Sequence, residues 1–255
     1  MPILENPPLI EAIFELRWGE IAPGQFFYSN DDQSLFAGMV SVAAATKGYK
    51  FVEQIQQNPN LPMFVSHRFR KKERVWPCFQ IGLGIFTVNQ VKDEYSWSSF
   101  KQSIKSGIEI FEQADSSKID KVKDNLSMVL RYQDAFFPEK DESIKEYLGK
   151  HFNVKVGLPI GFSENSNLNS NYSSINLKID INSINPKGIV TIMIAHAIIN
   201  DEPGLLMETI VQSKARDVFE SDSHLDSILK WVEMAHDIQK HSFRTLISPS
   251  AYDMG

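Results

Sequence analysis

Residues able to do acid–base, nucleophilic or metal chemistry are few in this chain, and their spacing suits none of the common centres. The 255 residues include 6 histidines and 1 cysteine. His236 and His241 lie ~140° apart around a helix, whereas two zinc ligands on one helix need a spacing of about three or four residues. Cys78 lies in the run Trp76-Pro77-Cys78-Phe79, which is typical of a small buried residue rather than of a nucleophile. The sequence therefore predicts no metal site.

Phosphate-binding motifs are also missing. Gly82-Leu83-Gly84 resembles the start of a dinucleotide-binding fingerprint, but the third glycine is absent and a strand pattern follows where a helix is needed. The chain has no G-x-x-x-x-G-K-[ST] loop, no G-x-S-x-G elbow and no H-E-x-x-H pair. We expect no cofactor, and the sequence disfavours an enzyme without excluding one.

A set of acids and arginines is the strongest candidate for a binding site. Glu11, Glu15 and Arg17 share one face of an expected strand, and Arg131 lies on the polar face of another. If the two strands are neighbours, these side chains form a cross-strand ion network, with Glu11 or Glu15 within ~8 Å of Arg131. The network could be a structural pairing, which is favoured, or a carboxylate-and-arginine ligand site. His236 is a further candidate ligand or base, although a hydrogen-bonded or exposed role is favoured.

A basic segment offers a second candidate surface. Arg70, Lys71, Lys72 and Arg74 cluster at the expected tip of a hairpin and could contact a polyanion. A solvated hairpin end is the favoured alternative. The net charge of -6 and the pI near 5.6 argue against a broad nucleic-acid-binding surface, which needs many clustered cations.

Hydrophobic periodicity indicates the elements that would position these side chains. Residues 10–18 alternate apolar and polar, which is typical of a strand with one buried face. Further strands are expected at 63–70, 75–90, 122–132, 175–181, 189–199 and 205–212. Helices are expected at 31–48, from Ser96 to about 115, at 141–151 and after Ser221-Asp222-Ser223. Residues 163–174, rich in Asn and Ser, are expected to form a surface loop.

Together these elements predict an α+β fold, an antiparallel sheet with helices packed on one face. Each half of the chain runs strand, helix, antiparallel strands, longer helix. Residues 1–118 and 119–255 are therefore predicted to form two similar β-α-β-β-α halves, or else one continuous domain. No residue-level repeat supports a duplication, and both alternatives stay open.

The composition favours a cytoplasmic protein. The single cysteine rules out an intrachain disulfide, and residues 1–8 have neither the positive nor the apolar region of a signal peptide. The longest apolar run, residues 189–199, is roughly half the ~20 residues that a membrane-spanning helix needs. We expect no membrane association.

Several stretches together resemble one family. They are Asn6-Pro7-Pro8 and the strand pattern that follows to Arg17; Phe86-Thr87-Val88-Asn89-Gln90 with Tyr95 and Trp97; Leu130-Arg131-Tyr132; and Ala235-His236-Asp237-Ile238 with Phe243, Leu246 and Met254-Gly255. On these residues the chain resembles a sporadically distributed, uncharacterised bacterial family whose members begin with an Asn-Pro-Pro motif. Gln133-Asp134 departs from the family pattern after Arg-Tyr. The resemblance implies no activity; a patchy distribution is typical of accessory genes, including those of phage defence and toxin–antitoxin pairs.

Three functional hypotheses follow. The leading one is a non-enzymatic binding protein that engages a protein partner or forms a homo-oligomer; nucleic acid is disfavoured as a partner. The second is a small-ligand-binding domain with an apolar cavity of ~300 Å³ or more between the sheet and the terminal helix. The third is an enzyme of unrecognised type, which would need His196 or His236 within ~3.2 Å of a carboxylate or hydroxyl at a cleft. His196 lies in an apolar strand and is expected to be an interior residue.

Overall fold

Long runs of alternating side chains form most of the strands, as the pleat requires. The computed structural model describes residues 8–55, 62–139, 142–163, 167, 174–219 and 223–248. The strands are β1 Leu9–Arg17, β2 Glu20–Ala22, β3 Gln25–Phe26, β4 Phe51–Gln54, β5 Val65–Arg70, β6 Cys78–Gly82, β7 Ile85–Val91, β8 Ser127–Phe136, β9 Asn176–Ser183, β10 Gly188–Ile199 and β11 Glu202–Lys214.

Helices begin where a serine can cap them. Ser29, Ser96, Ser143 and Ser223 each accept a hydrogen bond from a backbone N–H of the first helical turn. The helices are α1 Asn30–Ser34, α2 Phe36–Thr46, α3 Trp97–Ala114, α4 Lys118–Val122, α5 Ile144–His151, α6 Ile160–Ser163 and α7 His224–Leu246, with short 3-10 turns η1 Lys92–Glu94 and η2 Ala215–Asp217.

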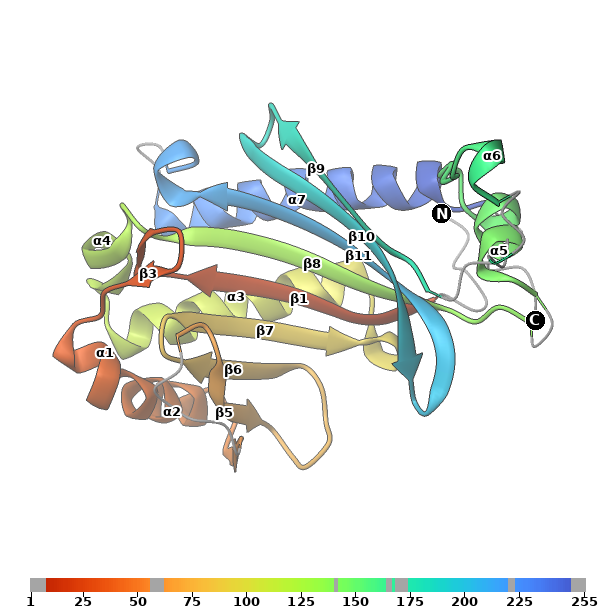
Figure 1. Ribbon diagram of the computed structural model, residues 1–255. Helices are drawn as coiled ribbons and strands as arrows, with labels where there is room; N and C mark the ends of the chain where they lie inside the picture. The colour runs from red at the N-terminus through yellow and green to blue at the C-terminus, as the bar shows by residue number, and fades with distance from the viewer. Residues whose placement is uncertain are drawn as a thin grey trace.

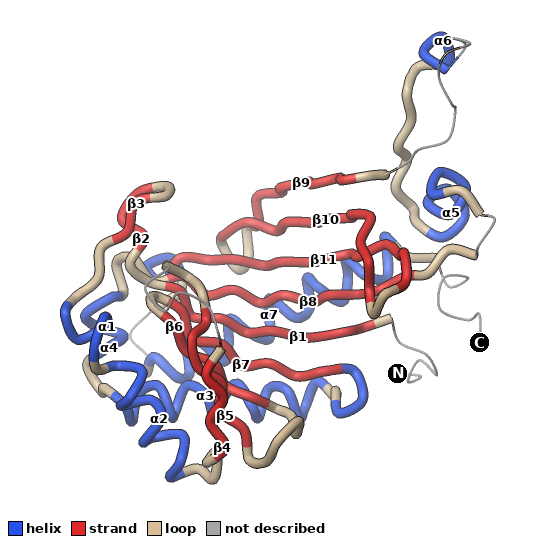
Figure 2. Tube along the Cα trace, turned by 60° about the horizontal axis from the view of Figure 1, so that its bottom comes forward, coloured by secondary structure: helices blue, strands red, loops and turns tan. Residues whose placement is uncertain are grey.

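Nine strands form one antiparallel sheet in the order β4-β5-β6-β7-β1-β8-β11-β10-β9, and β2 pairs with β3 separately. The first strand of each half of the chain, β1 or β8, lies at the centre, and the last strand of each half, β7 or β11, lies beside it. Figure 2 shows that the sheet is strongly curved, with β4, β5 and β6 turned across the strands that follow.

The core lies between the sheet and its helices, which cover one face (Figure 1). Phe14 of β1 faces Leu130 of β8, and Trp231 of α7 packs on Phe14 with ring centroids 6.4 Å apart. On α3, Gly107 lets the helix approach β7, because a Cβ atom there would lie 2.5 Å from Val88 Cγ2. The predicted α+β fold with helices on one face is confirmed.

Several predicted segment boundaries were wrong. Residues 75–90 form two strands, β6 and β7, because the backbone reverses at Gly84, whose φ of +77° favours glycine. Residues 118–122 form α4, so that β8 begins only at Ser127, and the helix expected at 31–48 is divided at Leu35. β4 was not among the predicted strands. The predicted loop at 163–174 lies mostly outside the described residues, as do Ser221 and Asp222.

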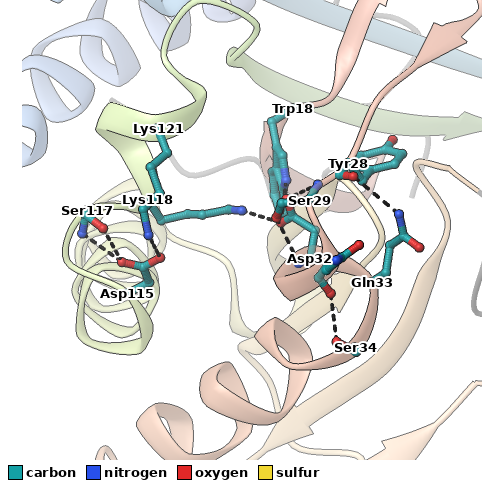
Figure 3. A network of polar contacts seen from close by, with 11 residues as sticks. Trp18, Tyr28, Ser29, Asp32, Gln33, Ser34, Asp115, Ser117, Lys118 and Lys121 are labelled. Atoms are coloured by element: carbon teal, nitrogen blue, oxygen red, sulfur yellow. Dashed lines mark hydrogen bonds and ion pairs between the residues drawn. The ribbon is translucent and has the colours of Figure 1, made fainter.

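The sheet is continuous across the predicted boundary at 118/119, since β1 pairs with β8. A buried ion pair also joins α1 to the start of α4, within residues 1–118 (Figure 3). The ammonium of Lys118 contacts the carboxylate of Asp32, and both side chains are only 5% exposed. Trp18 Nε1 donates a hydrogen bond of 3.1 Å to the same carboxylate. The idea of two similar halves stays a prediction.

None of the described helices is both long and apolar enough to cross a lipid bilayer.

Candidate functional site

The face of the sheet opposite the helices carries the candidate acids and arginines. Alternation along β1 directs Phe14 and Leu16 to the helices, so that Glu15 and Arg17 project from the other face. On β8, Leu130 and Tyr132 are likewise buried among the helices, and Arg131 between them projects the other way. We call this surface the open face.

Glu15 lies between two guanidinium groups. Its carboxylate is an ion-pair partner of Arg17, two residues along the same strand, and lies 3.6 Å from Nε of Arg131 on β8. The predicted proximity of Glu11 or Glu15 to Arg131 is therefore confirmed. Because Glu15 is only 3% exposed, its charge depends on these two arginines, as an unpaired buried carboxylate is costly.

The ion network continues across the next strand. Arg131 Nη1 lies 3.6 Å from Oε1 of Glu208 on β11, and Gln133 Nε2 donates to the same oxygen at 2.6 Å. Arg131 remains 24% exposed, and its Nε has no hydrogen-bond partner among the described residues. That Nε atom is itself buried, so a group arriving from solvent would reach only the exposed part of the Arg131 side chain.

Glu11 belongs to a separate group on the same face. Asn89 on β7 donates a hydrogen bond of 2.8 Å to Glu11, and Thr87 donates to Asn89. Burial raises the pKa of Glu11, while the hydrogen bond from Asn89 and the charges of Arg68, Arg131 and Arg70 oppose that shift. Glu11 and Glu15 therefore have different partners on the one face.

His236 lies on the other side of the sheet, away from these charges. Its ring stacks on Trp97 with centroids 3.7 Å apart, and Nδ1 lies 3.1 Å from the hydroxyl of Tyr132. The hydroxyl of Tyr95 is 2.9 Å from that of Tyr132. Burial lowers the pKa of His236 to about 4, although Asp237 and Glu233 oppose the shift, so the ring is neutral at pH 7. Four residues make up this group, and all four belong to the stretches on which the family resemblance depends: Tyr95, Trp97, Tyr132 and His236.

Asp134 lies on the same side of β8, two residues after Tyr132, and is a buried carboxyl group. Burial raises its pKa to about 7, and its Oδ2 has no hydrogen-bond partner among the described residues. The side chain is therefore substantially protonated near neutral pH.

The basic hairpin is smaller than predicted. Lys71, Lys72 and Arg74 are exposed on the β5–β6 connection. The prediction that Arg70 belongs to this exposed group was wrong, because its side chain is buried. Arg70 Nε lies 3.0 Å from Oε2 of Glu53, and its Cζ lies 4.5 Å from the centroid of the Trp76 ring. The cause is its position as the last residue of β5, where its side chain turns onto the curved sheet rather than into the loop.

Two other candidates have simple structural settings. Cys78 is buried, and burial raises the pKa of its thiol to about 12, which leaves it a poor nucleophile. His196 is exposed on β10, so the expectation of an interior residue is wrong.

Two hollows lie at the surface of the described part of the chain. A hollow of about 460 Å³ is lined by α5 and the segment after it, including Lys145, Phe152 and Val156. A second, of about 280 Å³, is lined by Glu20–Pro23, by Asp124 and Asn125 before β8, and by Lys214 and Arg216 at the end of β11. Neither is lined by His236 or lies between the sheet and α7. No group of three or more potential metal ligands occurs among the described residues.

Comparison with known protein families, with curated proteins and with solved structures found no match. The resemblance to a sporadic bacterial family therefore stays a prediction.

Sequence reasoning missed several members of the open face. Glu208, Gln133 and Asn89 complete its polar groups. Each follows directly after a buried apolar residue that faces the helices, namely Met207, Tyr132 and Val88, which was a signal that it faces away from them. The strand order could not be predicted from the sequence, and it is this order that places β7 beside β1 and β11 beside β8.

Proposed function

We propose that this protein is a non-enzymatic binding protein and that a macromolecular partner docks on the open face. The observation that carries the proposal is the exposed part of Arg131, held between Glu15 and Glu208 on a sheet face without helices. Arginine is favoured at the centres of protein interfaces because its planar fork makes several hydrogen bonds while its stem packs on apolar groups.

Apolar side chains flank this arginine. The register places Ile13 of β1 and Ile210 of β11 directly opposite Arg131, and both are partly exposed. A charged group within an apolar surround is a typical interface centre, since a partner that removes water strengthens the charge pairing. A protein partner fits this surface better than nucleic acid, because Glu11, Glu15 and Glu208 would repel a row of backbone phosphates, whereas a protein can present mixed polar and apolar groups.

The finer expectations belong to the same proposal. We infer a cytoplasmic bacterial protein with an accessory role of the defence or toxin–antitoxin type, supported by the composition and by the family resemblance. His236 meets the distance that the enzyme hypothesis requires, since its Nδ1 lies 3.1 Å from the Tyr132 hydroxyl. Enzymatic use is disfavoured because neither of the two described hollows is lined by His236. Ligand binding between the sheet and α7 is disfavoured, because Phe14 and Trp231 fill that layer.

The test compares two isoleucine-to-arginine variants in pull-downs from the native source, with bound proteins identified by mass spectrometry. Ile210→Arg adds bulk and charge to the open face without removing an ion pair. Ile198→Arg makes the same change on the opposite side of the sheet, where the side chain is exposed. We expect one partner to be retained by the wild type and by Ile198→Arg, and to be lost at least about 10-fold from Ile210→Arg. Recovery of partner-free wild-type chain at high concentration contradicts the proposal.

A further inference from the structure

β9 forms one edge of the sheet, and no other described strand pairs with its outer side (Figure 2). The strand is 8 residues long, and its Ile179 and Ile181 are 39% and 53% exposed. A long edge strand with exposed apolar side chains is a template for pairing with another strand. The opposite edge, β4, has only 4 residues.

The exposed isoleucines lie at the edge of the sheet face that the helices cover. Ile179 and Ile181 lie opposite Ile192 and Val190 of β10, which are buried on the helix side of the sheet. α7 packs on β8 and β11, and Ile179 and Ile181 of β9 stay exposed. An apolar strip therefore continues from the core to the free edge.

Hydrogen bonding to β10 determines which groups of β9 point outward. The N–H of His196 donates to the carbonyl of Ile175, its counterpart in the register, at 2.9 Å. Bonded pairs alternate along an antiparallel ladder, so the odd-numbered residues of β9 bond to β10. The even-numbered residues present their N–H and C=O groups at the free edge; they are Asn176, Lys178, Asp180 and Asn182.

We propose that a second copy of this chain pairs with β9, antiparallel, with the two-fold axis at Ile179. This arrangement pairs all the outward residues with one another: Asn176 with the partner's Asn182, and Lys178 with the partner's Asp180. On the helix side, Ile179 meets the partner's Ile179, and Leu177 meets the partner's Ile181. Each hydrogen-bonded pair closes two backbone bonds, and each apolar pair covers exposed core margin.

The charges select this register over its neighbours. An axis at Lys178 places that residue opposite its own copy, and an axis at Asp180 does the same for the carboxylate, so both set like charges against each other. Axes at Leu177 or Ile181 pair neither charge with its opposite and leave part of the edge uncovered. Only the axis at Ile179 gives two Lys–Asp pairs, and it pairs residues 176–182 with one another.

The test is charge complementation, read as the dissociation constant by sedimentation of the full chain. The wild type should dimerise. Lys178→Asp and Asp180→Lys each create two like-charge pairs in their own homodimers and should each weaken dimerisation at least roughly 10-fold. An equimolar mixture of these two variants restores opposite charges at both pairs, and so does the double variant Lys178→Asp/Asp180→Lys. Both should recover dimers, which a folding defect cannot explain.

Lys72→Asp, an equal charge change on the exposed β5–β6 connection, is the control and should dimerise as the wild type does. A wild type that stays monomeric to millimolar concentration overturns the proposal, as does a dimer unaffected by charge reversal and mixing. Lys178 and Asp180 project from the same face as Arg131, but β11 and β10 lie between β8 and β9 in the sheet. The two proposals therefore fail independently: Ile210→Arg should leave the β9 dimer intact.

Discussion

Arg131 connects three neighbouring strands through its ion pairs. It is an ion-pair partner of Glu15 and Glu208, which come from β1 and β11. Glu15 is the more deeply buried member and keeps only Arg17 if Arg131 is removed. The contribution of Arg131 to stability therefore comes mainly from the carboxylate that it neutralises.

We expect Arg131→Gln to lower the free energy of unfolding by about 1–3 kcal/mol, because a buried carboxylate loses one of two cations. The measurement is urea denaturation at pH 7. Arg74→Gln is the matched control: its side chain is 91% exposed, and its effect should stay within about 0.5 kcal/mol. Equal effects of the two substitutions contradict this view of Glu15.

Asp134 predicts a pH dependence with a definite sign. Its pKa is about 7 in the folded protein against 3.8 for a free side chain. Its contribution is thus fully present below pH 3.8 and is lost as the pH rises through 7. Asp134→Asn stays neutral, so the free energy of unfolding of the variant should rise relative to wild type between pH 4 and 8, by up to about 4 kcal/mol.

Urea denaturation at several pH values gives this difference directly. His236 acts with the opposite sign, because its folded pKa of about 4 is below its ordinary value of 6.5. Its contribution is present above pH 6.5 and is lost as the pH falls toward 4. Since both proteins contain His236, its effect cancels to first order in the comparison. A difference that does not change with pH excludes a buried neutral Asp134.

At the scale of elements, the distance between α3 and β7 depends on one small residue. Gly107 is buried at the contact, and a Cβ atom would lie 2.5 Å from Val88 Cγ2 and 3.2 Å from Phe79. The helix can approach the sheet only because this side chain is missing. A glycine in the interior of a helix otherwise costs about 0.5–1 kcal/mol relative to alanine.

Gly107→Ala should therefore lower the free energy of unfolding by about 1–3 kcal/mol, since overpacking outweighs the gain in helix propensity. Gly38→Ala in α2 is the matched control, because no heavy atom lies within 4 Å of its Cβ position. That substitution should stabilise the protein by about 0.4–1 kcal/mol. Thermal and urea denaturation of both variants separate the cost of steric overlap at Gly107 from the gain in helix propensity that alanine brings at either site. A stabilising Gly107→Ala is the contrary result.

At the scale of the whole molecule, the two halves of the chain depend on each other. β1 and β8 are paired at the centre of the sheet, and the buried cluster includes residues of β1, β7, β8, α3 and α7. Separation at 118/119 exposes one edge of each central strand and part of the shared core.

We expect fragments 1–118 and 119–255 to lack cooperative unfolding transitions when expressed separately, and to form a folded complex when expressed together. The reason is that each fragment loses the strand pair at its centre, where long-range contacts are densest. Circular dichroism with thermal denaturation measures this. A fragment that unfolds cooperatively alone would instead support two independently stable halves.

The sequence by itself determined the fold class and most of the element types. Period-two and period-3.6 hydrophobic patterns depend only on which residues must be buried, so β1, β10, α3 and α7 are visible in local sequence. The faces on which Glu15 and Arg131 project follow from the same alternation. Boundaries were less accurate where a turn interrupts an apolar run, as at Gly84 between β6 and β7.

Only the tertiary structure decided which polar residues meet. Strand order and register are long-range properties, set by packing of all the strands and helices together. They bring Glu208 to Arg131, make β9 an edge and turn Arg70 from the expected basic tip onto Glu53. No local pattern contains that information, because each strand's periodicity specifies its buried face but not its neighbour.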